Sequence, residues 1–217
     1  MPIAAATKLV SDVATSVKRQ FGDESGAQIT DTDIIRWVNL GQLELTRQQK
    51  WNKTTTTTPS VANQDTYNLP GVNIISIEAL FYNGVPLELR QFNEVQELIL
   101  SKTGIGQPIQ GGTPVLWYDW DDAVILYPPP TASGDTIKLY CVIQPATVTA
   151  LTDALSLPDI YFQSLLNFVM QQAYELDDDW QGVTQKRTQL KSDLGEIESD
   201  YGSDRYYPTV VVMQEDM

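Results

Sequence analysis

The sequence predicts an α+β protein: a discontinuous helical bundle of N-terminal and C-terminal helix pairs, an inserted antiparallel β domain, and an extended C-terminal tail. Near both ends of the chain, apolar residues recur every three to four positions, which is typical of amphipathic helices. The middle of the chain is instead rich in β-branched residues and turn dipeptides, which are typical of strands and hairpins. With 217 residues, 42% of them hydrophobic, the chain is long enough to bury a core of this kind without covalent staples.

Two amphipathic helices are predicted near the N-terminus. The first covers residues 5–21, and the glycine that follows, Gly22, favours its end. The second is expected to begin after Thr30, because Asp33 follows three residues later as in a capping box, and to reach about Lys50. Each apolar stripe needs a partner to cover it, so we expect these helices to pack against the helices at the other end of the chain.

The middle of the chain is predicted to form strands and hairpins. The expected strands cover residues 54–58, 66–69, 74–82, 85–89, 115–118, 123–127 and 136–143. Asn83-Gly84 favours a type I′ hairpin turn, and residues 119–122 are expected to form the turn of a second hairpin. One short helix is expected over residues 93–100, where the spacing of apolar residues changes.

Helical spacing returns in the last third of the chain. Pro158 suits the first turn of a helix, because its missing N–H is not needed there. Two apolar stripes follow, made by Phe162, Leu165, Leu166, Val169, Ala173 and Leu176, and by Val183, Leu190, Leu194, Ile197 and Tyr201. We therefore expect a helical bundle from residues 1–53 and 151–203, a β-rich inserted domain from residues 54–150, and an extended docking tail from residues 204–217.

The tail is unusual because it places an apolar run after a proline, with almost no chain left to cover it. Its candidate docking residues are Tyr206, Tyr207, Pro208, Val210, Val211, Val212 and Met213. Such a segment either folds back onto its own sheet or pairs with another subunit by β-augmentation, and we favour the second interpretation.

The charge is strongly negative and unevenly distributed. Lys and Arg number 14 against 28 Asp and Glu, a formal charge of −14. This disfavours a free-standing nucleic-acid reader, which needs basic side chains facing phosphates. The acidic excess lies toward the C-terminus, where Asp177, Asp178 and Asp179 form an uninterrupted run that we interpret as a solvated face or the lining of an acidic channel.

The composition also excludes several kinds of chemistry. The chain has no histidine and a single cysteine, Cys141, which excludes Ser-His-Asp and Cys-His catalysis, His-ligated metals and four-cysteine clusters. Cys141 alternates with Leu139 and Ile143 along a strand, so we expect it to be a buried apolar residue. We expect no catalytic residue, cofactor or metal, and no membrane segment, because no run of 18 apolar residues occurs.

Several short motifs resemble those of the head-to-tail adaptor (head completion or connector) proteins of tailed bacteriophages, especially short-tailed ones. They are Ile35-Arg36-Trp37-Val38-Asn39, Gly112-Thr113-Pro114-Val115-Leu116-Trp117-Tyr118, Ile125-Leu126-Tyr127-Pro128-Pro129-Pro130, Leu157-Pro158-Asp159 through Leu165, and Ala173-Tyr174-Glu175-Leu176. The resemblance covers roughly residues 25–195, and the order of the segments carries more weight than any one of them.

The resemblance implies a structural virion protein, made in the host cytoplasm, that assembles into a ring, expected to be twelve-fold, beneath the portal. It further implies that the C-terminal extension, here Tyr206 through Met213, docks onto the portal, and that the tail nozzle and possible tail fibres bind on the far side. Double-stranded DNA would pass through the ring without specific binding. An alternative function is a tail-fibre anchor or a carbohydrate-binding β module of a virion.

Overall fold

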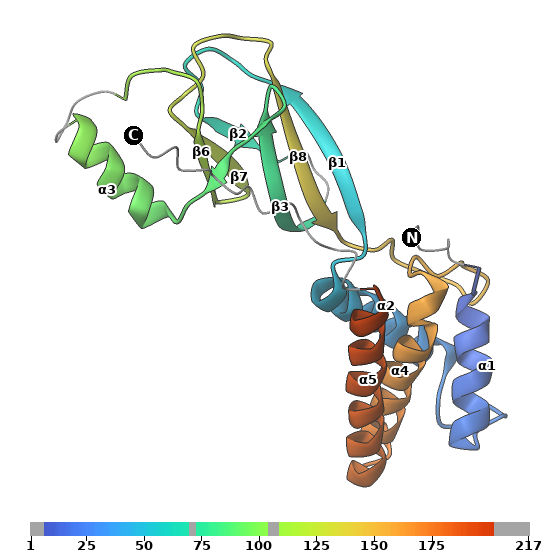
Figure 1. Ribbon diagram of the computed structural model, residues 1–217. Helices are drawn as coiled ribbons and strands as arrows, with labels where there is room; N and C mark the ends of the chain where they lie inside the picture. The colour runs from blue at the N-terminus through green and yellow to red at the C-terminus, as the bar shows by residue number, and fades with distance from the viewer. Residues whose placement is uncertain (1–6, 70–72, 104–108, 202–217) are drawn as a thin grey trace. The chain divides into compact units, whose positions relative to one another are not determined.

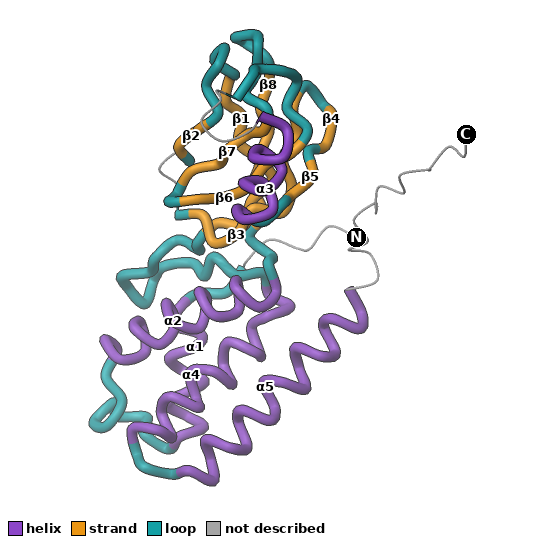
Figure 2. The backbone as a smooth tube through the Cα atoms, turned by 90° about the vertical axis from the view of Figure 1, so that its left-hand side faces the viewer, coloured by secondary structure: helices purple, strands orange, loops and turns teal. Residues whose placement is uncertain are grey.

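One part of this α+β protein contains helices α1, α2, α4 and α5, and another contains the strands together with helix α3, as Figures 1 and 2 show. The computed structural model describes residues 7–69, 73–103 and 109–201. The chain divides into two compact units: a helical unit of residues 1–45 with 145–217, and a β unit of residues 46–144. The prediction of an α+β fold is confirmed, and each unit is described in turn.

The helical unit is organised around one central helix, α4. Its elements are α1 (Val10–Phe21), α2 (Asp31–Gln49, whose last turn belongs to the β unit), the short 3₁₀ helix η1 (Asp159–Tyr161), α4 (Phe162–Leu176) and α5 (Trp180–Tyr201). α4 packs against α1 and α5, and its Leu165 and Phe168 meet α2 at Gly41. The core side chains Val17, Ile34 and Leu165 are fully buried between these helices, so the apolar stripes of both chain ends share one core.

A local pair of hydrogen bonds determines where α2 begins, and a long-range contact determines where α1 begins. The Asp33 N–H donates to the Thr30 hydroxyl at 3.2 Å, and the Thr30 N–H donates to the Asp33 carboxylate at 3.4 Å, which confirms the predicted capping box. α1 is shorter than predicted and begins only at Val10. The reason is non-local: Leu9 forms a β-bridge with Ala154, so Leu9 is extended rather than helical.

The loop between α1 and α2 is organised around the carboxylate of Asp23. This side chain is only 7% exposed and accepts the N–H groups of Ala27, Gln28 and Ile29 at 2.8–2.9 Å. The hydrogen bond from the Ile29 N–H is the largest cause that lowers the pKa of Asp23 to about 2. The charged carboxylate thus satisfies three backbone donors that the turn would otherwise leave unpaired.

The β unit is a sandwich of two four-stranded sheets. The first sheet has the order β1-β8-β3-β4 and the second the order β2-β7-β6-β5. The strands are β1 (Lys53–Pro59), β2 (Thr66–Asn68), β3 (Ile74–Tyr82), β4 (Val85–Pro86), β5 (Glu88–Leu89), β6 (Leu116–Trp120), β7 (Ala123–Tyr127) and β8 (Thr136–Ile143). Leu80, Leu139 and Cys141 of the first sheet pack against Trp117 and Leu126 of the second, and this forms the core of the sandwich.

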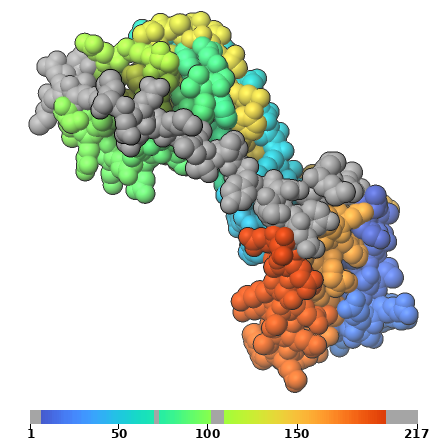
Figure 3. All heavy atoms as spheres, in the orientation of Figure 1, coloured from blue at the N-terminus to red at the C-terminus, as the bar shows by residue number. Residues whose placement is uncertain are grey.

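Helix α3 (Phe92–Thr103) covers the outer face of the second sheet. Its Val95 is buried against Leu116, Tyr118 and Tyr127, and Leu98 packs there too. Figure 3 shows the atoms of α3, in green, on the outer side of this unit. The β unit therefore has three layers: the first sheet, the second sheet and α3. Within the described part of this unit, no helix covers the outer face of the first sheet.

Two details of the strands differ from the predictions. The expected strand 85–89 is split, because Leu87 turns inward and is buried, and its N–H donates to the Leu80 carbonyl at 2.8 Å. The pieces join different sheets, and β5 pairs with β6 in parallel, so the expected all-antiparallel β domain is corrected to a mixed one. The second hairpin turn is also tighter than predicted: only Asp121 and Asp122 form it, both with positive φ.

The close approach of α2 and α4 at Gly41 gives a prediction for stability. A Cβ atom at this position would lie 2.6 Å from Leu165 Cδ1 and 2.9 Å from Phe168 Cδ1. We expect Gly41→Leu to lower the free energy of unfolding by about 1–3 kcal/mol through overpacking, measured by urea denaturation. The control is Gly195→Ala on α5, where a Cβ meets nothing within 4 Å, and which should stabilise the chain by about 0.5–1 kcal/mol. Equal effects of the two substitutions would contradict this packing.

The Asp23 loop gives a prediction for acid stability. Because the folded pKa of about 2 lies below the ordinary value of 3.8, the stabilisation is complete above about pH 4 and is lost as pH falls toward 2. Asp23→Asn should therefore lower Tm at neutral pH and remove this part of the acid dependence, as followed by circular dichroism from pH 7 to 2. The exposed neighbour Glu24 provides the control, Glu24→Gln. A variant that keeps the wild-type acid profile would contradict the role of Asp23.

Candidate assembly surfaces

The acidic run between α4 and α5 forms a turn rather than a helix end. α4 ends at Leu176, Asp178 has a positive φ, and the Asp179 carboxylate accepts the N–H groups of Gln181 and Gly182, each at 3.1 Å. Asp179 directly precedes α5, so its carboxylate lies at the positive end of that helix dipole, where a negative charge is favourable.

Asp177 and Asp178 have no comparable structural role in the described part of the chain. Both are exposed, as is Asp179, so the structure brings the three predicted residues together at a solvent-facing turn. Two exposed apolar side chains flank this turn: Leu176 precedes it and Trp180, 66% exposed, follows it. The assignment to an acidic channel stays a prediction. The predicted docking residues of the tail, Tyr206, Tyr207, Pro208, Val210, Val211, Val212 and Met213, lie outside the described residues.

The β unit presents a pair of exposed aromatic side chains beside α3, Phe92 and Trp120, which we call the aromatic rim. Trp120 is 56% exposed, and the Phe92 ring stacks on Trp120 with 4.6 Å between centroids. Trp117, on the opposite face of the same strand β6, is instead buried in the sandwich. An exposed, mutually stacked pair of large aromatic residues is typical of a contact surface.

Carboxylates surround the aromatic rim. An adjoining hollow of about 480 Å³ is lined by Glu88, Leu89, Arg90, Gln91, Phe92, Glu94 and Asp119. Arg90 forms ion pairs with Glu88 at 2.6 Å and with Glu94 at 3.7 Å, so its charge is already used within the patch. The charge that remains on the lining of this hollow is negative, because Glu88, Glu94 and Asp119 outnumber Arg90.

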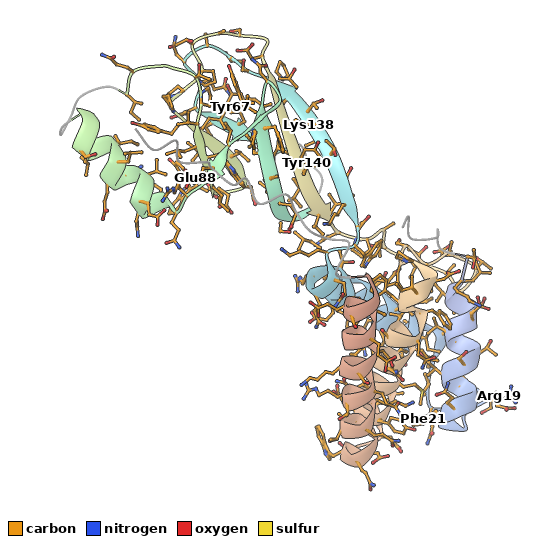
Figure 4. The ribbon with its side chains drawn as sticks, viewed as in Figure 1. Arg19, Phe21, Tyr67, Glu88, Lys138 and Tyr140 are labelled. Atoms are coloured by element: carbon orange, nitrogen blue, oxygen red, sulfur yellow. The ribbon has the colours of Figure 1, made fainter. Side chains whose placement is uncertain are left out.

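The outer face of the first sheet presents a different set of side chains, which we call the open face. Strand register places Thr55 opposite Tyr140, Thr57 opposite Lys138, and Phe81 beside Lys138 on the other neighbouring strand. The Lys138 ammonium lies 4.8 Å from the Tyr140 ring centroid, and the Phe81 and Tyr140 rings are 5.3 Å apart. Figure 4 shows Lys138 and Tyr140 together on this sheet, and Glu88 on the α3 side of the unit. The open face is therefore aromatic and basic.

A second hollow, of about 510 Å³, lies in the helical unit. It is lined by Ser11, Ala14, Thr15, Lys18, Arg19, Glu24, Asp31 and Leu151. The charged side chains that line it balance one another. Lys18 pairs with Asp31 at 2.7 Å, and the lining contains one further basic residue, Arg19, and one further acidic residue, Glu24. Figure 4 labels Arg19 at the end of α1, beside this part of the unit. The hollow therefore offers no excess charge to attract an ionic ligand.

Residues that carry reactive chemistry do not gather in the described part of the chain. Within residues 7–69, 73–103 and 109–201, no three His, Cys, Asp or Glu side chains lie where they could hold a metal ion. Cys141 is buried as predicted, and burial raises the pKa of its thiol. The helices in these ranges include none long and apolar enough to span a bilayer.

Neither the open face nor the aromatic rim was predicted from the sequence. The strand alternation around Trp117 and Trp120 contained usable information, because residues three apart on a strand point to opposite faces. Exposure of Trp120 followed from that spacing once Trp117 was assigned to the core. The open face had no such indication, since nothing local in β8 shows that one face of the sheet lacks a covering layer.

Comparisons with known proteins agree with these observations at the level of the family. A comparison with curated protein sequences gives no match. Among solved structures, one that matches is the neck of an empty GTA (gene transfer agent) particle computed with C6 symmetry, with 13% identity over 81% of this chain and 84% of that chain. Its TM-score of 0.25 is too low to support a structural conclusion. The family model of the SU10 adaptor protein matches residues 8–213, and the chain therefore belongs to the SU10 adaptor family of phage head-to-tail adaptors.

Proposed function

We propose that the chain is the subunit of a ring, expected to be twelve-fold, that lies between the portal and the tail nozzle. In this role it completes the head and forms part of the channel through which DNA is ejected. The single observation that carries the proposal is the match of the SU10 adaptor family to residues 8–213, which supports a structural connector in the virion. The partners are further copies of the chain, the portal and the tail nozzle, with tail fibres as a further candidate on the tail side.

Exposed aromatic side chains in both units support an assembly role. Trp180 of the helical unit and Trp120 of the β unit are both more than half exposed. Large exposed aromatic residues are enriched at protein interfaces, where they supply contact area at low entropic cost. In the proposed organisation, residues 1–53 with 151–203 form the helical bundle, residues 54–150 the inserted β domain, and residues 204–217 the tail that docks onto the portal.

The acidic charge fits a protein that stands beside DNA without binding it. The chain has twice as many acidic as basic side chains, and Asp177 and Asp178 are exposed without a structural role in the described residues. In a ring, carboxylates that face the lumen repel DNA phosphates, so that the genome slides instead of adhering. We assign Asp177 and Asp178 to such a lumen, together with Asp179, which also caps α5.

The tail assignment predicts the effect of a truncation. Deleting residues 204–217 should leave both units folded, as judged by circular dichroism, and should prevent attachment to portal rings in co-sedimentation. A matched test keeps the length: serine replacements of Val210, Val211 and Val212 should weaken docking, whereas serine replacements of the polar residues Gln214, Glu215 and Asp216 should not. Normal docking of the truncated chain would show that the tail does not hold the portal.

The channel assignment predicts a salt-dependent effect on DNA movement. Particles whose adaptor carries Asp177→Asn and Asp178→Asn should release DNA more slowly at low ionic strength, because less negative charge faces the phosphates. The difference should disappear at high salt, since screening removes repulsion beyond a few ångströms. Tm should not change, because neither carboxylate caps a helix. Release at the wild-type rate at every salt concentration would contradict a place in the lumen.

A further inference from the structure

We propose that neighbouring copies of the chain contact each other through two different surfaces of the β unit. The open face of one copy, centred on Lys138 and Tyr140, packs against the aromatic rim of the next copy, formed by Phe92 and Trp120. This inference rests on the proposed ring function and assigns the surfaces that would join its subunits.

The two surfaces lie on opposite sides of one three-layer unit. Lys138 and Tyr140 lie on the face of the first sheet that points away from the sandwich core, because their neighbour Leu139 points into it. Phe92 belongs to α3, which packs on the outer side of the second sheet, and it contacts Tyr118 and Trp120 there. One copy therefore presents the open face on one side and the aromatic rim on the other.

The charges of the two surfaces are complementary. On the open face, Lys138 supplies a positive charge beside the Tyr140 ring. The acidic residue of the neighbouring strand, Glu78, lies at a bulge, is nearly buried, and pairs with Lys50 at 3.0 Å. Around the aromatic rim the charges are those of Glu88, Glu94 and Asp119, offset only by Arg90, which is already paired within the patch. Contact between the two surfaces therefore brings opposite charges together.

Their apolar side chains match as well. Tyr140 is 37% exposed and lies beside Phe81, while Trp120 and Phe92 offer a stacked pair on the partner surface. The Lys138 ammonium lies over the Tyr140 ring. An aromatic ring of a second copy can approach the same ammonium from its other side and add a second cation–π contact. Aromatic contact with a charged edge is the composition expected of an interface centre and its rim.

Symmetry favours the pairing of two different surfaces. An interface that uses the same patch on both partners gives a closed dimer, whereas an interface between two different patches continues from copy to copy and forms a ring where the rotation between copies closes. Two copies that met through their aromatic rims would place carboxylates against carboxylates. Two copies that met through their open faces would place lysines together. Contact between the open face of one copy and the aromatic rim of the next avoids both kinds of repulsion.

Cross-linking tests the direction of the contact. Thr57 on the open face and Gln91 beside the aromatic rim are exposed and uncharged, and the native Cys141 is buried, so it supplies little background. The full-length chain carrying both Thr57→Cys and Gln91→Cys is mixed with rings of the portal protein from the same phage genome. The mixture is then treated with a short bismaleimide cross-linker. We expect a ladder of multimers from the double variant, dimers from a mixture of the two single variants, and no dimer from either single variant alone.

A charge exchange tests the chemistry of the same contact. Lys138→Glu and Asp119→Lys should each weaken copy-to-copy association by roughly tenfold or more, and the two reversals combined in one chain should restore it, because the opposite charges meet again. Lys138→Arg, which keeps the charge, is the matched control and should assemble normally. Failure of the combined variant to recover, while both single variants stay folded by circular dichroism, would overturn the pairing.

The outcomes separate this inference from the function on which it rests. If electron microscopy shows wild-type rings on the portal but the double-cysteine variant gives no ladder, the interface assignment is wrong and the ring stands. Dimers from Thr57→Cys alone or Gln91→Cys alone would show an isologous contact and would also overturn it. If the wild-type chain forms no ring with the portal, the proposed function fails and this inference fails with it. Capture of a tail-fibre protein or a glycan by the aromatic rim in assembled rings would assign that surface to another partner.

Discussion

The antiparallel pairing of β1 with β8 is the constraint on which the architecture depends. The β unit is inserted into a helical sequence, so the outgoing and returning segments must lie together, and this pairing runs from Lys53 opposite Val142 to Pro59 opposite Thr136. The Asn52 amide extends it by donating to the Ile143 and Gln144 carbonyls at 3.0 and 3.1 Å. In the helical unit, Asn39 both donates to and accepts from the Val148 backbone, each at 2.9 Å. The two ends of the insertion are thus held by asparagine side chains.

Because β1 and β8 close the insertion, each unit completes its own core from residues far apart in sequence. The helical core joins α1 and α2 to α4 across the whole length of the insertion, and α4 contacts all the other long helices of that unit. The β core uses only one face of the first sheet, since Leu139 and Cys141 point inward. The other face is left to be covered by something outside the unit or by water, and its aromatic residues favour the first.

The parts of the fold that could be predicted were those governed by local sequence. The capping box of Thr30 with Asp33, the Asn83-Gly84 turn and the burial of Cys141 all follow from residues within a few positions of each other. The split of residues 85–89 could not be predicted in this way, because it depends on Leu87 entering a core built by distant strands. Asp179 shows the same limit at the candidate surface: its role depended on where α5 begins, and three consecutive aspartates do not reveal that.

Because the net charge is strongly negative, the positions of the few basic side chains determine where two copies can meet without charge repulsion. Copies that each carry −14 repel one another at a distance, yet screening limits that repulsion to about 8 Å at physiological ionic strength. Association of identical copies then depends on which side chains of the two copies lie in contact. Residues 54–150 contain only three basic side chains, those of Arg90, Lys102 and Lys138. Arg90 is held by two glutamates of its own patch, whereas Lys138 lies on an exposed aromatic face. Among the side chains of residues 54–150 that the structure describes, Lys138 is therefore the basic one that a carboxylate of another copy can approach in the proposed ring.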